Sequence, residues 1–153
     1  MSIEEIKSFI AVTPTLAVGG QPTEDQLREI ADRGFEVVVN LGLLDQGYSL
    51  ADEAGLVRGL GLVYHHIPVD FEAPQAVDLQ RFLAVMDSSR GKRVFVHCAA
   101  NMRVSCFVSL YGEARLGWSR DQADDLVGQV WEPDEVWTRF LADSREELAT
   151  RPD

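Results

Sequence analysis

The chain has 153 residues, with 14 Lys and Arg against 25 Asp and Glu, so its formal charge is −11 at neutral pH. This charge argues against nucleic acid as the main ligand, because such binding depends on neutralising phosphates with Lys and Arg. It argues equally against an anionic membrane surface. The length predicts a single domain over residues 1–153 that buries about 70% of the surface of the unfolded chain.

Apolar periodicity and turn signals predict helices and strands in alternation along the chain. Strands are expected at 16–18, 35–41, 62–67 and 94–97, the second and third of them buried. Helices are expected at 3–10, 23–33, 50–59, 76–86, 104–116, 119–130 and from Pro133 onward. This order predicts an α/β fold, with a mostly parallel central sheet flanked by helices and a helical C-terminal third.

Ligands of such sheets bind beyond the carboxyl ends of the strands, which directs attention to the loops at 41–49, 68–75 and 98–103. In the third loop, the apolar strand ends at His97, Cys98 follows, and Arg103 stands in the first turn of the next helix. Backbone N–H groups at a helix N-terminus and a planar guanidinium form a cradle for an oxyanion, and their field favours a thiolate. The sequence therefore predicts that Cys98 and Arg103 act together.

The His97-Cys98 and Arg103 segment resembles the cysteine-dependent tyrosine and dual-specificity phosphatases. It is most similar to a small bacterial phosphatase-like family whose domain is also found fused to β-lactamase-like hydrolases. The similarity spans about residues 14–118 and implies a dual-specificity-phosphatase-like sheet. The other segments that carry it are Gly20-Gln21-Pro22-Thr23, Val39-Asn40-Leu41, and Ile67-Pro68-Val69 with Pro74.

The resemblance implies a role for each site residue in hydrolysing a phosphomonoester. Cys98 would attack phosphorus to form a cysteinyl-phosphate, and Arg103 would hold the equatorial oxygens. Asp70 is the best match for the general acid, Glu72 is the reserve, and Ser105 matches the hydroxyl that eases departure of the thiolate. The residues expected to line the phosphate are Ala99, Ala100, Asn101 and Met102, with Glu72 nearby.

The spacing departs from the phosphatase signature, because four residues rather than five separate Cys98 from Arg103. One position on a helix turns a side chain by about 100° and moves it about 1.5 Å. The loop also lacks glycine, so Asn101 is the residue expected to adopt the left-handed conformation. Rhodanese-type sulfurtransferases have a similarly short loop, so a persulfide on Cys98 is one alternative function. A catalytically weak phosphate-binding module is the other.

Several other conspicuous residues are expected to have structural rather than catalytic roles. Cys106 lies in an apolar helix and is expected in the core, and His97 is expected to make a structural hydrogen bond behind the loop. His65 and His66 point to opposite faces of a strand, so no metal site is predicted, and no organic cofactor is implied.

The expected substrate and cellular location follow from the same features. The expected substrate is a phosphorylated protein or a small phosphomonoester, while the oligomeric state is not encoded in any visible pattern. The segment from Arg90 to Arg103 holds four basic residues and no acid, and the acidic remainder would favour basic sequence around a phosphorylated site. An acidic start, no signal-like segment and no long apolar run predict a cytoplasmic location, where thiols stay reduced.

Overall fold

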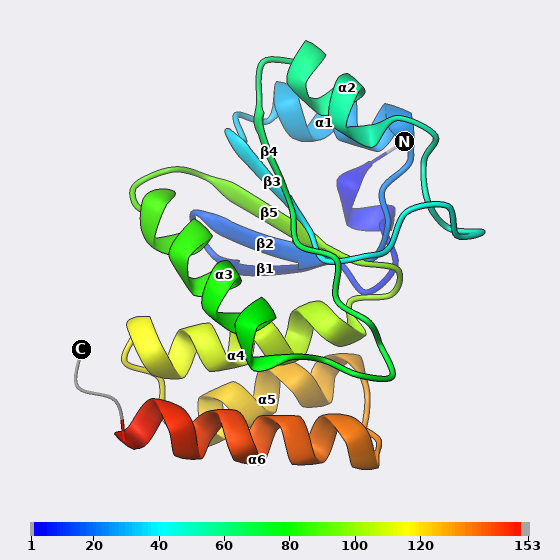
Figure 1. The fold of residues 1–153 in the computed structure, drawn as a ribbon. Coiled ribbons are helices and arrows are strands. Elements are labelled where there is room, and N and C mark those ends of the chain that lie inside the picture. Colours follow the sequence, from blue (N-terminus) through cyan, green and yellow to red (C-terminus); the bar gives the residue numbers. More distant parts are fainter. Residues whose placement is uncertain (1, 151–153) are drawn as a thin grey trace.

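A five-stranded sheet runs through the centre of the computed structural model, which describes residues 2–150 (Figure 1). The strands are β1 (Ile10–Thr13), β2 (Leu16–Gly19), β3 (Val37–Asn40), β4 (Val63–His66) and β5 (Val94–His97). Their spatial order is β1-β2-β5-β3-β4. β1 runs antiparallel to β2, whereas the other neighbouring pairs are parallel, which confirms the mostly parallel sheet.

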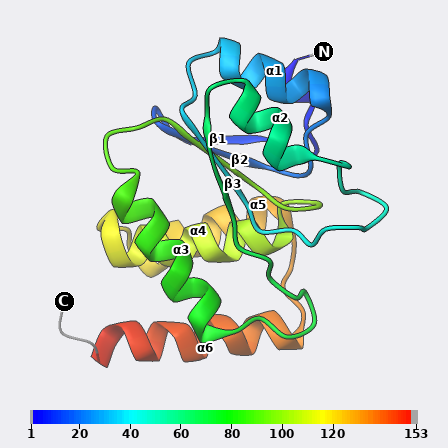
Figure 2. The same cartoon turned by 45° about the horizontal axis from the view of Figure 1, so that its top comes forward.

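Helices cover both faces of this sheet. They are η1 (Ile3–Glu5, a 3-10 helix), α1 (Glu24–Asp32), α2 (Glu53–Gly59), α3 (Ala76–Ser88), α4 (Met102–Arg115), α5 (Arg120–Val130) and α6 (Glu135–Thr150). α1 and α2 lie on one face, and α3 and α4 lie on the other, with α5 and α6 stacked beneath α4 (Figures 1 and 2). No helix within residues 2–150 is both long enough and apolar enough to cross a membrane.

Alternation along the central strands divides the core into two. In β5, Val94 and Val96 pack toward the α3–α6 side, while Phe95 packs toward α1 and α2. Val38 of β3 likewise joins the second cluster, and its neighbours Val37 and Val39 join the first. The apolar runs therefore form strands that are buried on both faces, as the sequence pattern indicates.

Two predicted elements differ from the structure. The segment expected as a helix at 3–10 forms only the three-residue η1, because Ile6 takes an extended conformation with ψ 137° that ends the helix. A turn in which Ser8 has a positive φ of 54° then leads into β1. The strand expected to be buried at 62–67 is instead the edge strand β4, where 44% of Val63 is exposed.

The helical C-terminal third is assembled around α4, most of whose residues are buried between the sheet and the α5–α6 layer. Gly112 allows this packing, since a Cβ at that position would lie 2.0 Å from the Trp118 ring. Trp137 of α6 is fully buried against Phe107 of α4, with ring centroids 6.1 Å apart. Packing against α4 thus holds α5 and α6 behind the sheet.

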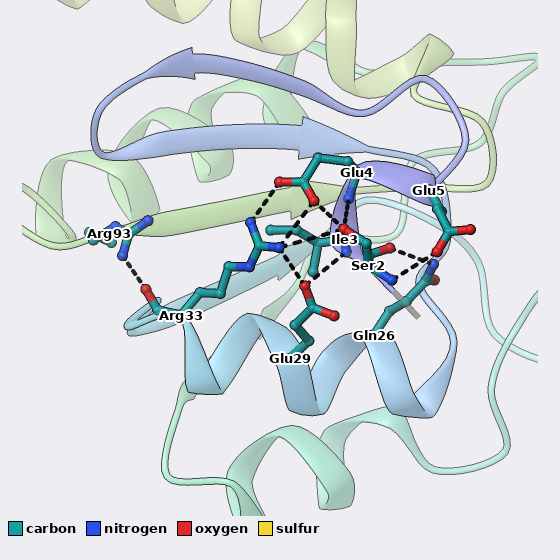
Figure 3. Close-up of polar contacts among 8 residues, drawn as sticks. All are labelled: Ser2, Ile3, Glu4, Glu5, Gln26, Glu29, Arg33 and Arg93. Atoms are coloured by element: carbon teal, nitrogen blue, oxygen red, sulfur yellow. Dashed lines mark hydrogen bonds and ion pairs between the residues drawn. The ribbon is translucent and has the colours of Figure 1, made fainter.

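The N-terminal segment is attached to α1 by a polar cluster on the surface (Figure 3). Arg33 pairs with Glu4 at 2.6 Å and with Glu29 at 2.7 Å, and Glu29 also accepts a hydrogen bond from the Ile3 backbone. Hydrogen bonds from Arg33 and Ser2 lower the pKa of Glu4 to about 2. Ile3 is buried beneath this cluster, so the segment has a fixed position beside the sheet.

Candidate functional site

Arg103 joins the three loops that the strand-end rule selects. Its Nη1 donates to the carbonyl of Val69 at 2.8 Å, and its Nη2 donates to the Tyr48 hydroxyl at 3.3 Å. The guanidinium carbon also lies 5.9 Å from the ring centroids of both Tyr48 and Phe71. The loops at 41–49, 68–75 and 98–103 therefore meet at one side chain, at the carboxyl end of the sheet.

The Cys98–Arg103 loop is a tight turn between β5 and α4. Asn101 has φ 66° and ψ 0°, which confirms the left-handed conformation expected of it, and it is the N-cap residue of α4. The helix begins at Met102, two residues earlier than the sequence pattern predicts, so Arg103 is its second residue. The first N–H groups of a helix lack intrahelical acceptors, so this turn presents donors beside Cys98.

The end of β2 supports this loop through its backbone. The Cys98 amide donates to Gly19 at 3.4 Å, and the Gln21 amide donates to Ala99 at 3.1 Å. Gly20 is required for the close approach, because a Cβ there would lie 2.6 Å from the Ala99 carbonyl oxygen. Gly20 and Gln21, which belong to one of the segments that carry the family resemblance, thus support the loop.

The N-terminal segment supports the loop from a second direction. The Asn101 side chain donates to the carbonyl of Ser8 at 2.8 Å, and the Gly20 amide donates to the carbonyl of Lys7 at 2.8 Å. Ser8 has a positive φ and lies in the turn between η1 and β1, within the segment expected as a helix. The unexpected turn therefore has a structural role beside the site.

Exposure divides the loop into a buried cysteine and a more accessible crest. Cys98 is 1% exposed, and Arg103 is 5% exposed. Ala99, Ala100 and Met102 are partly exposed, whereas Asn101 is buried.

Asp70 lies next to the residue that holds Arg103. It follows Val69, is exposed, and its Oδ1 accepts a hydrogen bond from the Glu72 backbone at 2.9 Å. Glu72 is also exposed and lies two residues beyond Asp70 in the loop. The structure therefore places both predicted acids on the loop that contacts Arg103, with Asp70 nearer in sequence to the contact.

Aromatic residues of the C-terminal third anchor the loop that carries Asp70. The Trp137 indole donates to the carbonyl of Phe71 at 2.8 Å. The Phe71 ring lies 5.6 Å from Trp131 and 5.9 Å from Trp137, measured between centroids. Both tryptophans pack within the protein, and their function here is to fix the position of the 68–75 loop.

A buried carboxylate behind the loop was missed at the level of sequence. Glu53, the first residue of α2, lies 2.5 Å from His97 Nε2 and accepts from Gln21 Nε2 at 2.8 Å. The other ring nitrogen of His97 lies 3.3 Å from the Cys98 carbonyl oxygen, so the expected hydrogen bond behind the loop is present. A histidine at the end of a buried strand signals that some partner must exist, but not which acid supplies it.

The ionisation of Glu53 follows from competing effects on its pKa. Burial raises the pKa, but hydrogen bonds from His97 and Gln21 and the charge of His97 outweigh burial, so the pKa is lowered overall. The carboxylate form is therefore the stable one in the interior.

Two other residues of the same helix occupy less direct positions. The Ser105 hydroxyl donates to the Met102 carbonyl at 2.8 Å, so its hydrogen is directed at the helix backbone rather than at Cys98. Cys106 is fully buried in the core as expected, and burial raises the pKa of its thiol to about 12.

The basic residues that precede the loop in sequence do not surround it in space. Arg90 and Arg93 lie before the start of β5, whereas Cys98 follows its end. Arg90 pairs with Asp87 at 3.5 Å, and Arg93 stacks on Phe35 at 4.4 Å. Of these cations, Arg103 alone is at the candidate site.

Comparison with known proteins agrees with this arrangement. A family model described as "DSP-PTPase phosphatase fused to NAD+ Kinase" matches residues 7–129, which include the whole of the Cys98–Arg103 loop. The chain belongs to this family of dual-specificity-type phosphatases.

Individual relatives share the fold closely. A DUF442 protein from Shewanella putrefaciens CN-32, described as a candidate phosphatase, superposes with a TM-score of 0.87 at 30% identity, covering 95% of this chain and 96% of that one. Tk-PTP in its active form gives a TM-score of 0.72 at 25% identity, covering 95% and 98% of the two chains.

A curated relative confirms the resemblance to domains associated with β-lactamase-like hydrolases. The beta-lactamase hydrolase-like protein of Xylella fastidiosa is 27% identical over 121 residues, which is 77% of this chain. The chain spans 28% of the length of that relative.

Proposed function

We propose that the chain hydrolyses phosphomonoesters through a cysteinyl-phosphate formed on Cys98. The observation that carries the proposal is the position of Arg103, which is buried at the meeting point of three loops and adjoins the cysteine-bearing turn. A guanidinium has five N–H groups, and the contacts with Val69 and Tyr48 use two of them. The remaining donors suit the oxygens of a phosphoryl group.

The first chemical step transfers the phosphoryl group to sulfur. The Cys98 thiolate attacks phosphorus, the S–P bond forms, and the bond from phosphorus to the leaving oxygen breaks. Asp70 gives its proton to that leaving oxygen, so an alcohol or phenol departs. Arg103 and the amides of the 99–102 turn hold the remaining oxygens while charge develops on them.

The second step returns the enzyme to its starting state. Asp70, now a carboxylate, takes a proton from a water molecule that attacks phosphorus. The S–P bond breaks, inorganic phosphate leaves, and the thiolate is regenerated. A rotation of Ser105 away from Met102 would let its hydroxyl donate to the departing sulfur.

The short spacing between Cys98 and Arg103 is accommodated by the surroundings of the arginine. Because the helix begins at Met102, Arg103 extends from its first turn toward the 41–49 and 68–75 loops, which hold the guanidinium from two sides. A cation in the first turn of a helix is otherwise unfavourable, which supports a functional reason for its presence.

The test compares turnover of p-nitrophenyl phosphate by the wild-type chain and by single variants. Cys98→Ser is expected to abolish turnover, and Asp70→Asn is expected to lower kcat and alter the acidic and basic limbs of the pH profile. Glu72→Gln is the matched control on the same loop and should retain most activity. Full turnover by Cys98→Ser would refute the mechanism, and a crippled Glu72→Gln beside a silent Asp70→Asn would move the acid to Glu72.

The substrate is proposed to be a phosphorylated protein or a small phosphomonoester in the cytoplasm. Exposed Asp70 and Glu72 beside Arg103, together with the net charge of −11, favour basic rather than acidic groups around the phosphate. The same assay with phosphopeptides flanked by Lys or by Glu tests this preference, which a higher kcat/KM on the acidic peptide would contradict.

A further inference from the structure

A buried pair, Glu53 and His97, lies directly behind the cysteine of the candidate site. Glu53 is 4% exposed and His97 is fully buried, so neither group can exchange its partner for water. The pair links α2, through the ring of His97, to the backbone carbonyl of Cys98. Gln21, from the segment that supports the loop, binds the other carboxylate oxygen of Glu53.

The partners of His97 determine where its protons lie. A carbonyl oxygen only accepts, so the nitrogen that faces the Cys98 carbonyl, Nδ1, must carry hydrogen. At Nε2, a carboxylate oxygen lies 2.5 Å away, and a carboxylate also accepts. With Glu53 ionised, both ring nitrogens are donors, which makes His97 an imidazolium.

We propose that Glu53 is a positioning residue that keeps His97 doubly protonated, so that a buried cation is held behind the Cys98 carbonyl. The carboxylate balances the charge that burial would otherwise expel. Through the two hydrogen bonds of the ring, Glu53 also fixes the backbone of Cys98 at the point where the strand ends.

The other titratable groups around the pair are compatible with this arrangement. The charge of His66 helps to lower the pKa of Glu53. Burial and the Glu53 charge raise the pKa of Tyr64, also on β4, to about 12. Tyr64 is therefore a neutral phenol near pH 7. His66 Nε2 lies 2.7 Å from the carbonyl oxygen of Gly42, so its own partner lies in the 41–49 loop.

The consequence for chemistry rests on the proposed function, in which Cys98 attacks as a thiolate. A cation behind the Cys98 carbonyl stabilises negative charge on the sulfur of the same residue, and it complements the donors of α4 and Arg103 on the other side. The Glu53 carboxylate lies on the far side of the His97 ring from the Cys98 carbonyl. The imidazolium is therefore nearer to Cys98 and has the larger effect on the charge of its sulfur.

The experiment measures the rate of iodoacetamide alkylation of Cys98 against pH, with each adduct located by mass spectrometry. Glu53→Gln removes the negative charge but preserves the shape of the side chain, so His97 should lose one proton. The midpoint of the alkylation profile should rise by about one pH unit. With p-nitrophenyl phosphate, kcat/KM should fall about tenfold on the acidic side and approach the wild-type value at high pH. Glu53→Asp, which restores the charge, should recover part of both losses.

A matched control separates this role from simple support of the fold. Glu113 of α4 is a partly buried carboxylate paired with Arg145 at 2.8 Å, away from the loop. Glu113→Gln should lower the melting temperature and leave the alkylation midpoint unchanged. The proposal is overturned if Glu53→Gln lowers or preserves the midpoint, whatever its melting temperature.

A direct measurement covers the case in which Glu53→Gln does not fold. Long-range ¹H–¹⁵N spectra of the wild-type chain at pH 7.5 should show both ring nitrogens of His97 protonated, and one unprotonated nitrogen would refute the proposal. The alkylation profile does not depend on turnover. Activity retained by Cys98→Ser would therefore overturn the phosphatase mechanism while the role of Glu53 is still measured.

Discussion

Cys98 and Cys106 lie eight residues apart, and both are buried in the same apolar cluster, yet their polar neighbours differ. Cys98 follows the end of β5 in a turn beside Arg103 and the first N–H groups of α4. Cys106 lies inside α4, within the apolar core between the sheet and the C-terminal helices. Burial is therefore common to both thiols, whereas position relative to the helix N-terminus differs, and a helix N-terminus favours a thiolate.

The same difference extends to the neighbouring polar groups. Burial raises the pKa of the Cys106 thiol to about 12, and contacts with Ser105 and Trp131 offset only part of that rise. Cys98 has the His97–Glu53 pair behind its carbonyl and a guanidinium on the adjoining turn. One helix thus presents a charged environment at its start and an apolar one in its second turn.

The largest expected contrast between the two thiols is their reaction with iodoacetamide. At pH 7.5, the wild-type chain should acquire one adduct, on Cys98, while Cys106 stays unmodified because its thiol is protonated and enclosed. Intact-mass analysis followed by peptide mapping measures this. Inorganic phosphate should slow the reaction, since it would occupy the loop.

The Cys98→Ser variant provides the control for that contrast, because it should acquire no adduct over the same period. Modification of Cys106 at a rate comparable to that of Cys98 in the folded protein would show that helix position does not separate the two thiols.

Much of this fold could be predicted from local patterns. The capping boxes at Thr23 and Ser119 define where α1 and α5 begin, and the apolar runs locate the central strands. The antiparallel strand β1 was not predicted. It pairs with β2 across the turn at Pro14 and Thr15, and it begins at Ile10, where the apolar pattern had indicated the end of a helix. The edge position of β4 is likewise a matter of strand order, which the composition of a short apolar run does not encode.

The candidate site was predictable in part for the same reason. Cys98 and Arg103 are adjacent in sequence to a strand and a helix, so their proximity follows from local structure. Glu53, the first residue of α2, and Tyr48, in the 41–49 loop, lie more than 40 residues away in sequence, and nothing local marks them among the other acids and aromatics. Their roles depend on long-range packing, which brings Tyr48 to Arg103 and Glu53 to His97.

An intermediate effect is expected in the stability of the protein at alkaline pH. The Cys106 thiol has a pKa of about 12 in the folded chain, against an ordinary value of 9.0. Below pH 9, both states are protonated and the stabilisation is complete; above pH 9, the unfolded chain releases a proton that the folded chain keeps, so stability falls. By urea unfolding, the free energy of unfolding of wild type should exceed that of Cys106→Ala by about 1–2 kcal/mol at pH 7. Above pH 9, this difference should shrink by about 1 kcal/mol per pH unit.

This comparison removes the other groups that titrate in the same range. Tyr64 and Tyr111 also have raised pKa values, but both chains contain them, so their contributions cancel in the difference. Turnover of Cys106→Ala near pH 7 should match wild type. A difference in stability that does not change between pH 8 and 10.5 would contradict the assignment of Cys106 as the buried neutral thiol.

The smallest expected effect is that of a change at Tyr48, which contacts Arg103 beside Cys98. Tyr48→Phe keeps the ring against Arg103 but removes the hydroxyl that accepts hydrogen bonds from Arg103 at 3.3 Å and from the Leu43 amide at 2.9 Å. A net loss of about 0.5–1.5 kcal/mol corresponds to a two- to tenfold rise in KM for p-nitrophenyl phosphate and in the inhibition constant of inorganic phosphate. The alkaline stability difference set by Cys106 should not change. If KM falls instead, the hydroxyl competes with phosphate for the guanidinium, and Tyr48 restrains Arg103 rather than presenting it to the substrate.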